Sequence, residues 1–138
     1  MSERCGELAR QYFERFWNQR DLAAFDELSD ANAVAYQPNG AVTSARQLRD
    51  VEFPELLKAI PDLQMHVEDV ITSGDNAVVR WKATGKHTGD GMGFKASRQS
   101  IAFTGMTWLV FRDEKITTGW NCWDQGGLMK ALSEGSLG

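Results

Sequence analysis

The spacing of apolar residues changes near the middle of the chain, and this change limits the folds that the sequence can adopt. Before Pro61 apolar side chains recur every three or four residues, as on a helix that buries one face. After Pro61 they alternate with polar residues, as on strands with one buried face. The predicted helices are 7–18, 21–28, 45–60 with an interruption at Pro54, and 126–132. The predicted strands are 33–36, 63–72, 77–85, 100–112 and 115–123.

This order of elements predicts an α+β fold. Short turns join the later strands, so these should pair antiparallel, and the sheet should curve around the N-terminal helices as a cone-shaped α+β barrel. A length of 138 residues fits one domain, 1–138, with a core large enough to enclose a pocket. The apolar contents of the cone can form either the core or the walls of a pocket for a large flat molecule. They are Tyr12, Phe16, Leu56, Phe103 and the tryptophans.

Charge and cysteine content exclude several classes of function. The chain has 15 basic and 19 acidic residues, a net charge of -4, and no basic run, which argues against nucleic acid or an anionic membrane as partner. Cys5 and Cys122 lie far apart without metal-ligand spacing, so neither a metal site nor a disulfide is predicted. No apolar run approaches the roughly 18 residues of a membrane span, and no signal-peptide pattern opens the chain. We expect a cytoplasmic protein.

Asp124 is the first candidate for a catalytic residue, because it stands at the end of an aromatic strand. With alternation from Ile116 onwards, Trp120 and Asp124 share one face of that strand. Asn121 and Trp123 share the other face. A carboxylate beside an indole in a poorly hydrated pocket has a raised pKa, which suits it to general acid/base catalysis. The alternative is that Asp124 is the N-cap of the following helix, and the sequence leaves both open.

A set of short motifs is spread over most of the chain. They are Val79-Arg80-Trp81-Lys82-Ala83-Thr84-Gly85-Lys86-His87-Thr88-Gly89, Phe103-Thr104-Gly105, Lys115-Ile116, and Trp120 and Asp124 ahead of Leu128-Met129. As a set they resemble the SnoaL-like polyketide cyclases, in the superfamily of cone-shaped nuclear-transport-factor-like proteins. The resemblance implies an enzyme without cofactor or metal, acting on a hydrophobic polycyclic polyketide. Its reaction would be an intramolecular aldol ring closure, with the pocket aspartate, Asp124, as acid and base.

The resemblance also suggests residues that would act with Asp124. By analogy with limonene epoxide hydrolase, another member of the superfamily, the strand face carrying Arg80 and Lys82 points inward, and Tyr36 matches a tyrosine that positions water. By strand order, Arg80, Lys82 and His87 are the nearest candidates to donate to the enolate or alkoxide oxygen. The alternatives are that Arg80 and Lys82 lie in solvent and that His87 is a surface or turn residue. The residues expected to bind substrate are Phe16, Tyr36, Lys82, Phe103, Trp108 and Trp120.

Three functions remain open at the level of sequence. The first is a cofactor-free cyclase of aromatic polyketides. The second is another enzyme on the same cone, a polyketide hydroxylase or an epoxide hydrolase, although Lys82 and Thr84 stand where the hydrolase needs its second acid. The third is a binding module without catalysis. We also expect a homodimer or homotetramer, because Trp81 or Trp123 on an exposed sheet surface would favour self-association.

Overall fold

The first part of the chain is mostly helical and the second part mostly strands. The computed structural model describes residues 2–137, and the side chains of residues 3–133. The helices are α1 (Ser2–Gln11), η1 (Tyr12–Asn18), α2 (Leu22–Leu28), α3 (Ala45–Gln47), η2 (Leu48–Glu52), α4 (Phe53–Ala59), η3 (Gly91–Gly93) and α5 (Gln125–Leu137). The strands are β1 (Ser29–Tyr36), β2 (Val42–Ser44), β3 (Gln64–Ser73), β4 (Asn76–Lys86), β5 (Ser100–Arg112) and β6 (Lys115–Trp123). The predicted α+β class is confirmed.

The strands form one six-stranded sheet in the order β2-β1-β6-β5-β4-β3. Strands β3 to β6 pair antiparallel as neighbours in sequence, as predicted. Strand β1 instead pairs parallel with β6, through Val34 with Thr118 and Tyr36 with Trp120. The sheet is therefore mixed and open, with β2 and β3 at its edges, and the expectation of a wholly antiparallel sheet is corrected. Pairing between strands so distant in sequence leaves no turn signal, and β2 is too short to show alternation.

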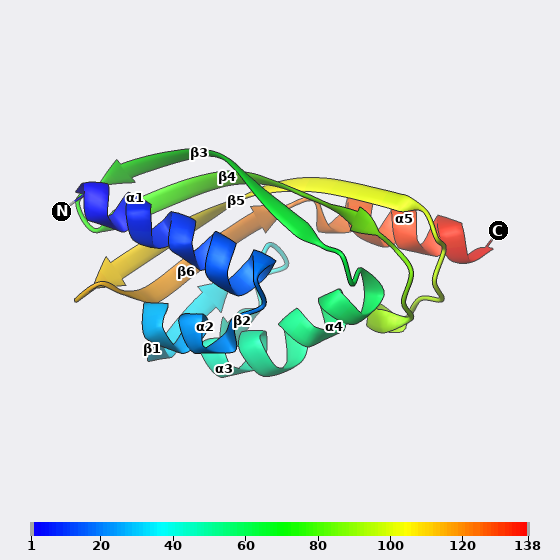
Figure 1. Ribbon diagram of the computed structural model, residues 1–138, viewed down its shortest axis with the longest axis horizontal. Coiled ribbons are helices and arrows are strands. Elements are labelled where there is room, and N and C mark those ends of the chain that lie inside the picture. Colours follow the sequence, from blue (N-terminus) through cyan, green and yellow to red (C-terminus); the bar gives the residue numbers. More distant parts are fainter. Residues whose placement is uncertain (1, 138) are drawn as a thin grey trace.

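The helices cover one face of the curved sheet (Figure 1). Helix α1 runs across the strands, helices α2 to α4 lie below them, and α5 lies at the end of the molecule away from the N-terminus. Strand β4 shows how the two faces differ, because Val79 and Trp81 are buried while Arg80 and Lys82 are exposed. The face with Val79 and Trp81 is thus the inner one. No helix in the described part of the chain is long and apolar enough to cross a bilayer.

A group of aromatic rings joins the helices to one another. Phe16 in η1 stacks on Phe53 at the start of α4, with centroids 4.1 Å apart and planes at 25°. The ring of Phe25 in α2 lies 4.7 Å from that of Phe16. Burying each of these rings contributes about 1.5–3 kcal/mol. The side chain of Asn18 adds two hydrogen bonds to the backbone of Met65, at 2.7 and 3.0 Å, which tie η1 to β3.

Pro54 lies in a helix that is irregular at the predicted place. The stretch predicted as one helix over 45–60 consists of α3, the π-helical turn η2 and α4. Pro54 stands in the first turn of α4, where a missing backbone N–H removes no helical hydrogen bond. The change from π to α geometry therefore falls at the predicted interruption, directly before the proline.

Candidate functional site

A cavity of about 420 Å³ lies between the inner face of the sheet and the helices. Pockets for small molecules commonly have volumes of roughly 300–1,000 Å³. The lining is predominantly apolar. On the helical side it comprises Tyr12, Phe13, Trp17, Phe25, Leu48, Val51, Glu52, Glu55, Leu56 and Met129. Helices α3, η3 and α5 add Ala45, Met92 and Gln125, and the sheet and the loop after β1 supply Ser29, Ala33, Val34, Ala35, Gln37, Met65, Trp81, Phe103, Thr107, Leu109, Ile116, Gly119, Asn121 and Trp123.

Two π-helical turns, η1 and η2, supply side chains to the helical wall of the cavity. Turn η2 is closed by a hydrogen bond from the Phe53 N–H to the Leu48 carbonyl, five residues back. Turns of this type are rare, and they occur frequently at functional sites. The last residue of η2 is Glu52, whose side chain lines the cavity. The wider turn thus ends on a carboxylate at the cavity wall.

The carboxylate of Glu52 has the properties expected of a catalytic acid or base. Its Oε2 is buried and has no hydrogen-bond partner among the described residues. Burial raises the pKa of Glu52, because a poorly hydrated site disfavours the charged form. The other acid of the lining, Glu55, is exposed and its Oε1 accepts the Met92 N–H at 2.7 Å. Glu52 is therefore the stronger candidate of the two.

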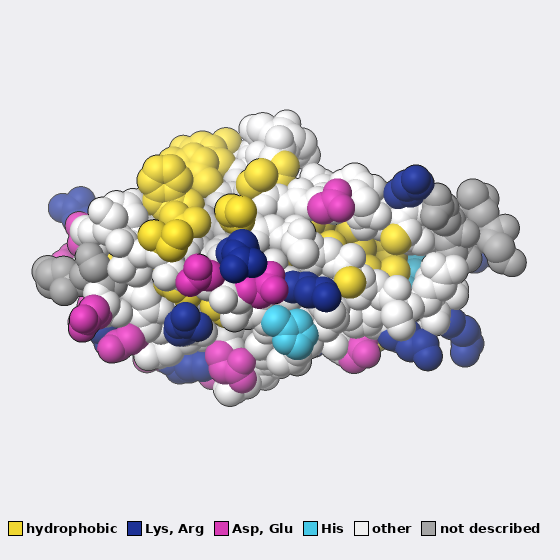
Figure 2. Space-filling view, turned by 90° about the horizontal axis from the view of Figure 1, so that it is seen from above, with side chains coloured by type: hydrophobic (Ala, Val, Ile, Leu, Met, Phe, Trp, Pro, Cys, Tyr) yellow, Lys and Arg dark blue, Asp and Glu magenta, His cyan; other side chains and the backbone are white. Residues whose placement is uncertain are grey.

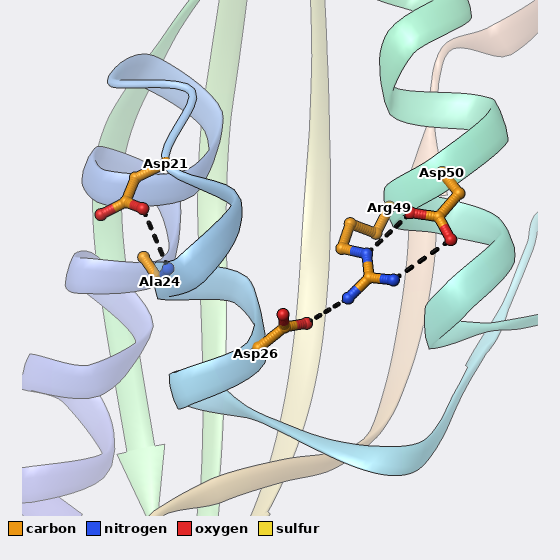
Figure 3. Close-up of polar contacts among 5 residues, drawn as sticks. All are labelled: Asp21, Ala24, Asp26, Arg49 and Asp50. Atoms are coloured by element: carbon orange, nitrogen blue, oxygen red, sulfur yellow. Dashed lines mark hydrogen bonds and ion pairs between the residues drawn. The ribbon is translucent and has the colours of Figure 1, made fainter.

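Residues before and after Glu52 attach turn η2 to the rest of the protein, and Figure 3 shows the contacts of Arg49. The guanidinium of Arg49 donates to Asp26 of α2 at 2.5 Å and to the two oxygens of Asp50 at 2.8 and 3.1 Å. Arg49 lowers the pKa of Asp50 through these bonds. On the other side, Phe53 is buried against Phe16. Turn η2 is thereby attached to both α2 and the aromatic core.

A line of hydrogen bonds crosses the inner face of the sheet beneath the cavity. Trp81 Nε1 donates to Thr107 Oγ1, and Thr107 Oγ1 to Asn121 Oδ1, both at 2.9 Å. Asn121 Nδ2 then donates to Gln37 Oε1, and Gln37 Nε2 to Thr43 Oγ1, both at 3.5 Å. We call these residues the polar line. Except for Thr43, all of them line the cavity. The mostly apolar lining therefore has a connected row of polar groups on its sheet side.

Asp124 lies outside the cavity lining. Its side chain is exposed, and its Oδ1 accepts the Gly127 N–H at 2.9 Å in the first turn of α5. This is the geometry of an N-cap. The expected contact of Asp124 with Trp120 in a dry pocket is wrong, and the capping alternative describes the residue.

A β-bulge explains why the alternation from Ile116 placed Asp124 on the wrong face. Phe111 pairs with Ile116 and Val110 with Thr118, which leaves Thr117 as an extra residue in β6. Side chains after the bulge therefore change face relative to Ile116. The inner residues of β6 are Ile116, Gly119, Asn121 and Trp123, all of which line the cavity.

Most of the other predicted site residues lie on the outer face of the sheet. Arg80 and Lys82 are exposed there, and Arg80 forms an ion pair with Glu68 at 3.4 Å. The inward orientation expected by analogy is therefore wrong, and the solvent alternative holds. Tyr36 and Trp108 are also exposed, on either side of Trp120. The Tyr36 ring stacks on that of Trp120, with centroids 5.4 Å apart.

The remaining predicted residues are buried, and one of them lines the cavity. Phe103 is part of the lining, whereas Phe16 belongs to the aromatic core between the helices. His87 is fully buried but is not a lining residue. Its Nδ1 accepts the Ser97 N–H at 3.2 Å and lies 2.9 Å from Ser97 Oγ. His87 therefore holds the loop between β4 and β5, rather than lying in a surface turn.

The sequence did carry signals for the acid and the amide that were missed. Glu52 stands four residues after Leu48 and four before Leu56, and residues at this spacing share one face of a helix. An acid on an apolar helical stripe points towards the interior. Asn121 alternates with Trp123, which marks it as polar on a face that also carries a large ring. Among the described residues, no cluster of three or more His, Cys, Asp or Glu side chains could hold a metal ion.

The family model for SnoaL-like polyketide cyclases matches residues 7–132 of the sequence. The chain belongs to this family. The match includes β1 to β6 and both π-helical turns. It therefore includes every residue that lines the cavity. No curated protein shows significant sequence similarity to the chain.

Several solved structures have the same fold. AclR, a proposed hydroxylase from Streptomyces galilaeus, has a TM-score of 0.86 and 23% identity over 97% of this chain and 83% of that chain. A proposed SnoaL-like polyketide cyclase from Jannaschia sp. CCS1 has a TM-score of 0.87 and 20% identity, covering 96% and 93%. IdmH, a proposed polyketide cyclase from Streptomyces antibioticus, has a TM-score of 0.82 and 23% identity, covering 93% and 97%. At these identities the likeness shows the fold alone.

Proposed function

We propose that this SnoaL-like protein is a cofactor-independent enzyme that closes a ring in a polycyclic aromatic polyketide by an intramolecular aldol reaction. One observation carries the proposal: the apolar cavity contains a partly buried carboxylate, Glu52, with an unpartnered oxygen and a raised pKa. A raised pKa makes a carboxylate a stronger base, and its acid form can return the proton. Glu52 thus takes the role that the sequence suggested for Asp124.

The reaction follows from the position of Glu52 in an apolar site. The carboxylate removes a proton from a carbon that lies between two carbonyl groups, and the resulting enolate carbon forms a bond to a ketone carbon of the same molecule. The ketone oxygen then takes the proton from the Glu52 carboxylic acid. Atoms and electrons balance without an oxidant or a metal. The cavity walls hold the polyketide substrate in a folded conformation, so that much of the entropy cost of ring closure is met on binding.

Two alternative enzymes differ in what the cavity would have to provide. A hydroxylase without a bound cofactor would need molecular oxygen, and AclR, which has the same fold, is named as a proposed hydroxylase. An epoxide hydrolase of the two-acid type would need an arginine between its acids. No lysine or arginine of the described residues lines the cavity, because Arg80 and Lys82 lie on the outer face. The structure thus offers less support for the hydrolase than for the other two.

The test is an incubation of metal-free protein with tricyclic and tetracyclic polyketide substrates, with and without oxygen, followed by mass spectrometry. We expect cyclisation without oxygen, and a loss of about 10²-fold or more in turnover for Glu52→Gln. Asp124→Asn is the matched control, since asparagine caps a helix as well as aspartate does. It should keep its turnover. Loss of turnover in Asp124→Asn alone would restore the original assignment, and an oxygen-dependent gain of one oxygen atom would indicate a hydroxylase.

We further propose that the protein forms a homodimer through the outer face of the sheet. The tryptophans expected to do this, Trp81 and Trp123, line the cavity instead. Apolar residues that pair directly with one another form a row across all six strands, which we call the apolar row; all of them are exposed except Val78, which is half-buried. Its members are Ile71, Val78, Trp108, Trp120, Tyr36 and Val42. Figure 2 shows hydrophobic side chains gathered at one part of this face, beside charged ones.

A further inference from the structure

We infer that Asn121 presents an oriented amide donor to the cavity, which binds a carbonyl oxygen of the substrate. The inference rests on the proposed function, because it assumes that the cavity receives a polycyclic ligand. It adds a chemical requirement that the apolar walls do not impose. The ligand must carry a carbonyl group at the position that lies against β6.

The direction of the polar line is set at its first residue. The indole of Trp81 can only donate, so Thr107 Oγ1 accepts there. The hydroxyl hydrogen of Thr107 then needs an acceptor, and Asn121 Oδ1 lies at 2.9 Å. With the Asn121 amide turned over, Thr107 would accept twice and its own hydrogen would lose this acceptor. Thr107 is only 5% exposed, so an unpaired hydroxyl there would be unfavourable.

The orientation of Asn121 leaves its amide nitrogen free to donate. Its carbonyl oxygen is held by Thr107, so Nδ2 must point away from that residue. Among the described residues the one hydrogen bond of Nδ2 is the long contact of 3.5 Å with Gln37 Oε1. An amide nitrogen carries two hydrogens. At least one of them is therefore available to a ligand in the cavity that Asn121 lines.

The chemistry of the ligand follows from what surrounds this donor. The walls around Asn121 are largely apolar, so a hydrocarbon would cover the N–H without replacing its bond to water. A carbonyl oxygen would satisfy it. In the aldol reaction, negative charge develops on such an oxygen, and Asn121 would stabilise it while Glu52 on the helical wall takes the proton. Trp81 and Thr107 are then positioning residues, because they act on the ligand through Asn121.

The first test compares two ligands of the same shape on the unaltered protein. Xanthone carries a ring carbonyl, and xanthene has a CH₂ group in its place. We expect xanthone to bind about tenfold more tightly or better, measured by equilibrium dialysis, because a site built for a hydrogen bond rejects the analogue that lacks it. Equal binding of both would overturn the inference but leave the proposed function. Binding of neither would overturn both.

The second test uses variants of the polar line. At pH 8 the carboxylate of Asn121→Asp cannot donate, so xanthone affinity should fall to within about threefold of the xanthene affinity, which itself should not change. Thr107→Val keeps the shape but releases the Asn121 amide, and should lower xanthone affinity by about threefold. Thr118→Val, on the outer face of the same strand, is the control and should bind as the unaltered protein does. Loss of affinity for both ligands would mean a collapsed cavity and would contradict a specific carbonyl contact.

An infrared measurement separates donation from packing and needs no comparison of affinities. A hydrogen bond from Asn121 lowers the stretching frequency of the bound xanthone carbonyl relative to the free ligand in a hydrocarbon solvent. We expect this lowering in the unaltered protein and in Thr118→Val, and a smaller one in Thr107→Val. An unshifted carbonyl band in the unaltered protein would overturn the inference, whether or not the variants fold.

Discussion

The inner face of the sheet, although mostly apolar, carries a row of polar groups, and the outer face, although it carries Arg80 and Lys82, has a row of apolar ones. Sheets covered on one side commonly turn apolar residues inward and polar residues outward. Here the polar line crosses the inner face, and the apolar row crosses the outer face. Two tryptophans illustrate the difference: the Trp81 indole donates to Thr107 in the interior, whereas the Trp108 indole donates to the half-buried Asn76 and Trp108 itself is 47% exposed.

The two faces are suited to different binding partners. Polar groups beneath an apolar cavity are most useful when a ligand supplies matching polar atoms. Exposed aromatic rings in a row are most useful when another protein surface covers them. We therefore propose that the inner face serves ligand binding and chemistry, and the outer face assembly. Substitutions at inner and outer positions can test whether the two faces have these different roles.

The largest effect is expected from removing an inner ring. Trp81→Ala should lower the free energy of unfolding by about 3–5 kcal/mol, because it leaves a cavity in the core and removes the hydrogen bond that Thr107 Oγ1 accepts from the indole. Trp108→Ala should lower it by about 1 kcal/mol or less, since that ring is half exposed. Urea denaturation at low protein concentration measures both. Similar losses for the two variants would remove the distinction between the faces.

An intermediate effect is expected on assembly. Trp120→Lys places a charge in the middle of the apolar row, between Tyr36 and Trp108, and should weaken the proposed dimer by about 2 kcal/mol or more. Sedimentation at micromolar concentration should show a dimer for the unaltered protein and a monomer for the variant. Thr104→Glu, exposed on the same face outside the row, should remain dimeric. A monomeric unaltered protein would contradict the proposed role of this face.

Local patterns in the sequence were sufficient for most of the fold, because they reflect local physical causes. The four later strands alternate since each has one buried face, and their turns join neighbours. The parallel pairing of β1 with β6 joins residues such as Tyr36 and Trp120 across most of the chain. No local pattern records that contact, so an antiparallel sheet was the natural expectation.

The candidate site was harder to predict, because it depends on two irregularities of the backbone. The bulge at Thr117 reverses the faces of β6, which moves Asp124 outward relative to Ile116 and leaves Asn121 inside. The π-helical turn η2 ends on Glu52 and directs it to the cavity. Neither irregularity has a reliable sequence signal. The aromatic Phe103, on a regular strand with normal alternation, was placed correctly in the lining.

The smallest effect is the pH dependence that Glu52 gives to stability. Burial raises its pKa in the folded state above the ordinary value of 4.5, so the folded protein holds this proton more tightly than the unfolded chain does. The contribution of Glu52 is therefore lost as pH rises from about 4.5 through the raised pKa. Glu52→Gln cannot ionise, and should gain stability relative to the unaltered protein over that range in urea denaturation.

Asp50, on the outside of the same helical turn, provides the opposite sign for comparison. Arg49 lowers its pKa below the ordinary value of 3.8, so its contribution is present above pH 3.8 and is lost as pH falls through the lowered pKa. Asp50→Asn should therefore lose stability relative to the unaltered protein as pH rises into this range, while Glu52→Gln gains it at higher pH. A Glu52→Gln difference that stays constant with pH would mean that the carboxylate is as well hydrated in the folded protein as in the unfolded chain, and the inner wall would then lack the dry acid that the proposed chemistry requires.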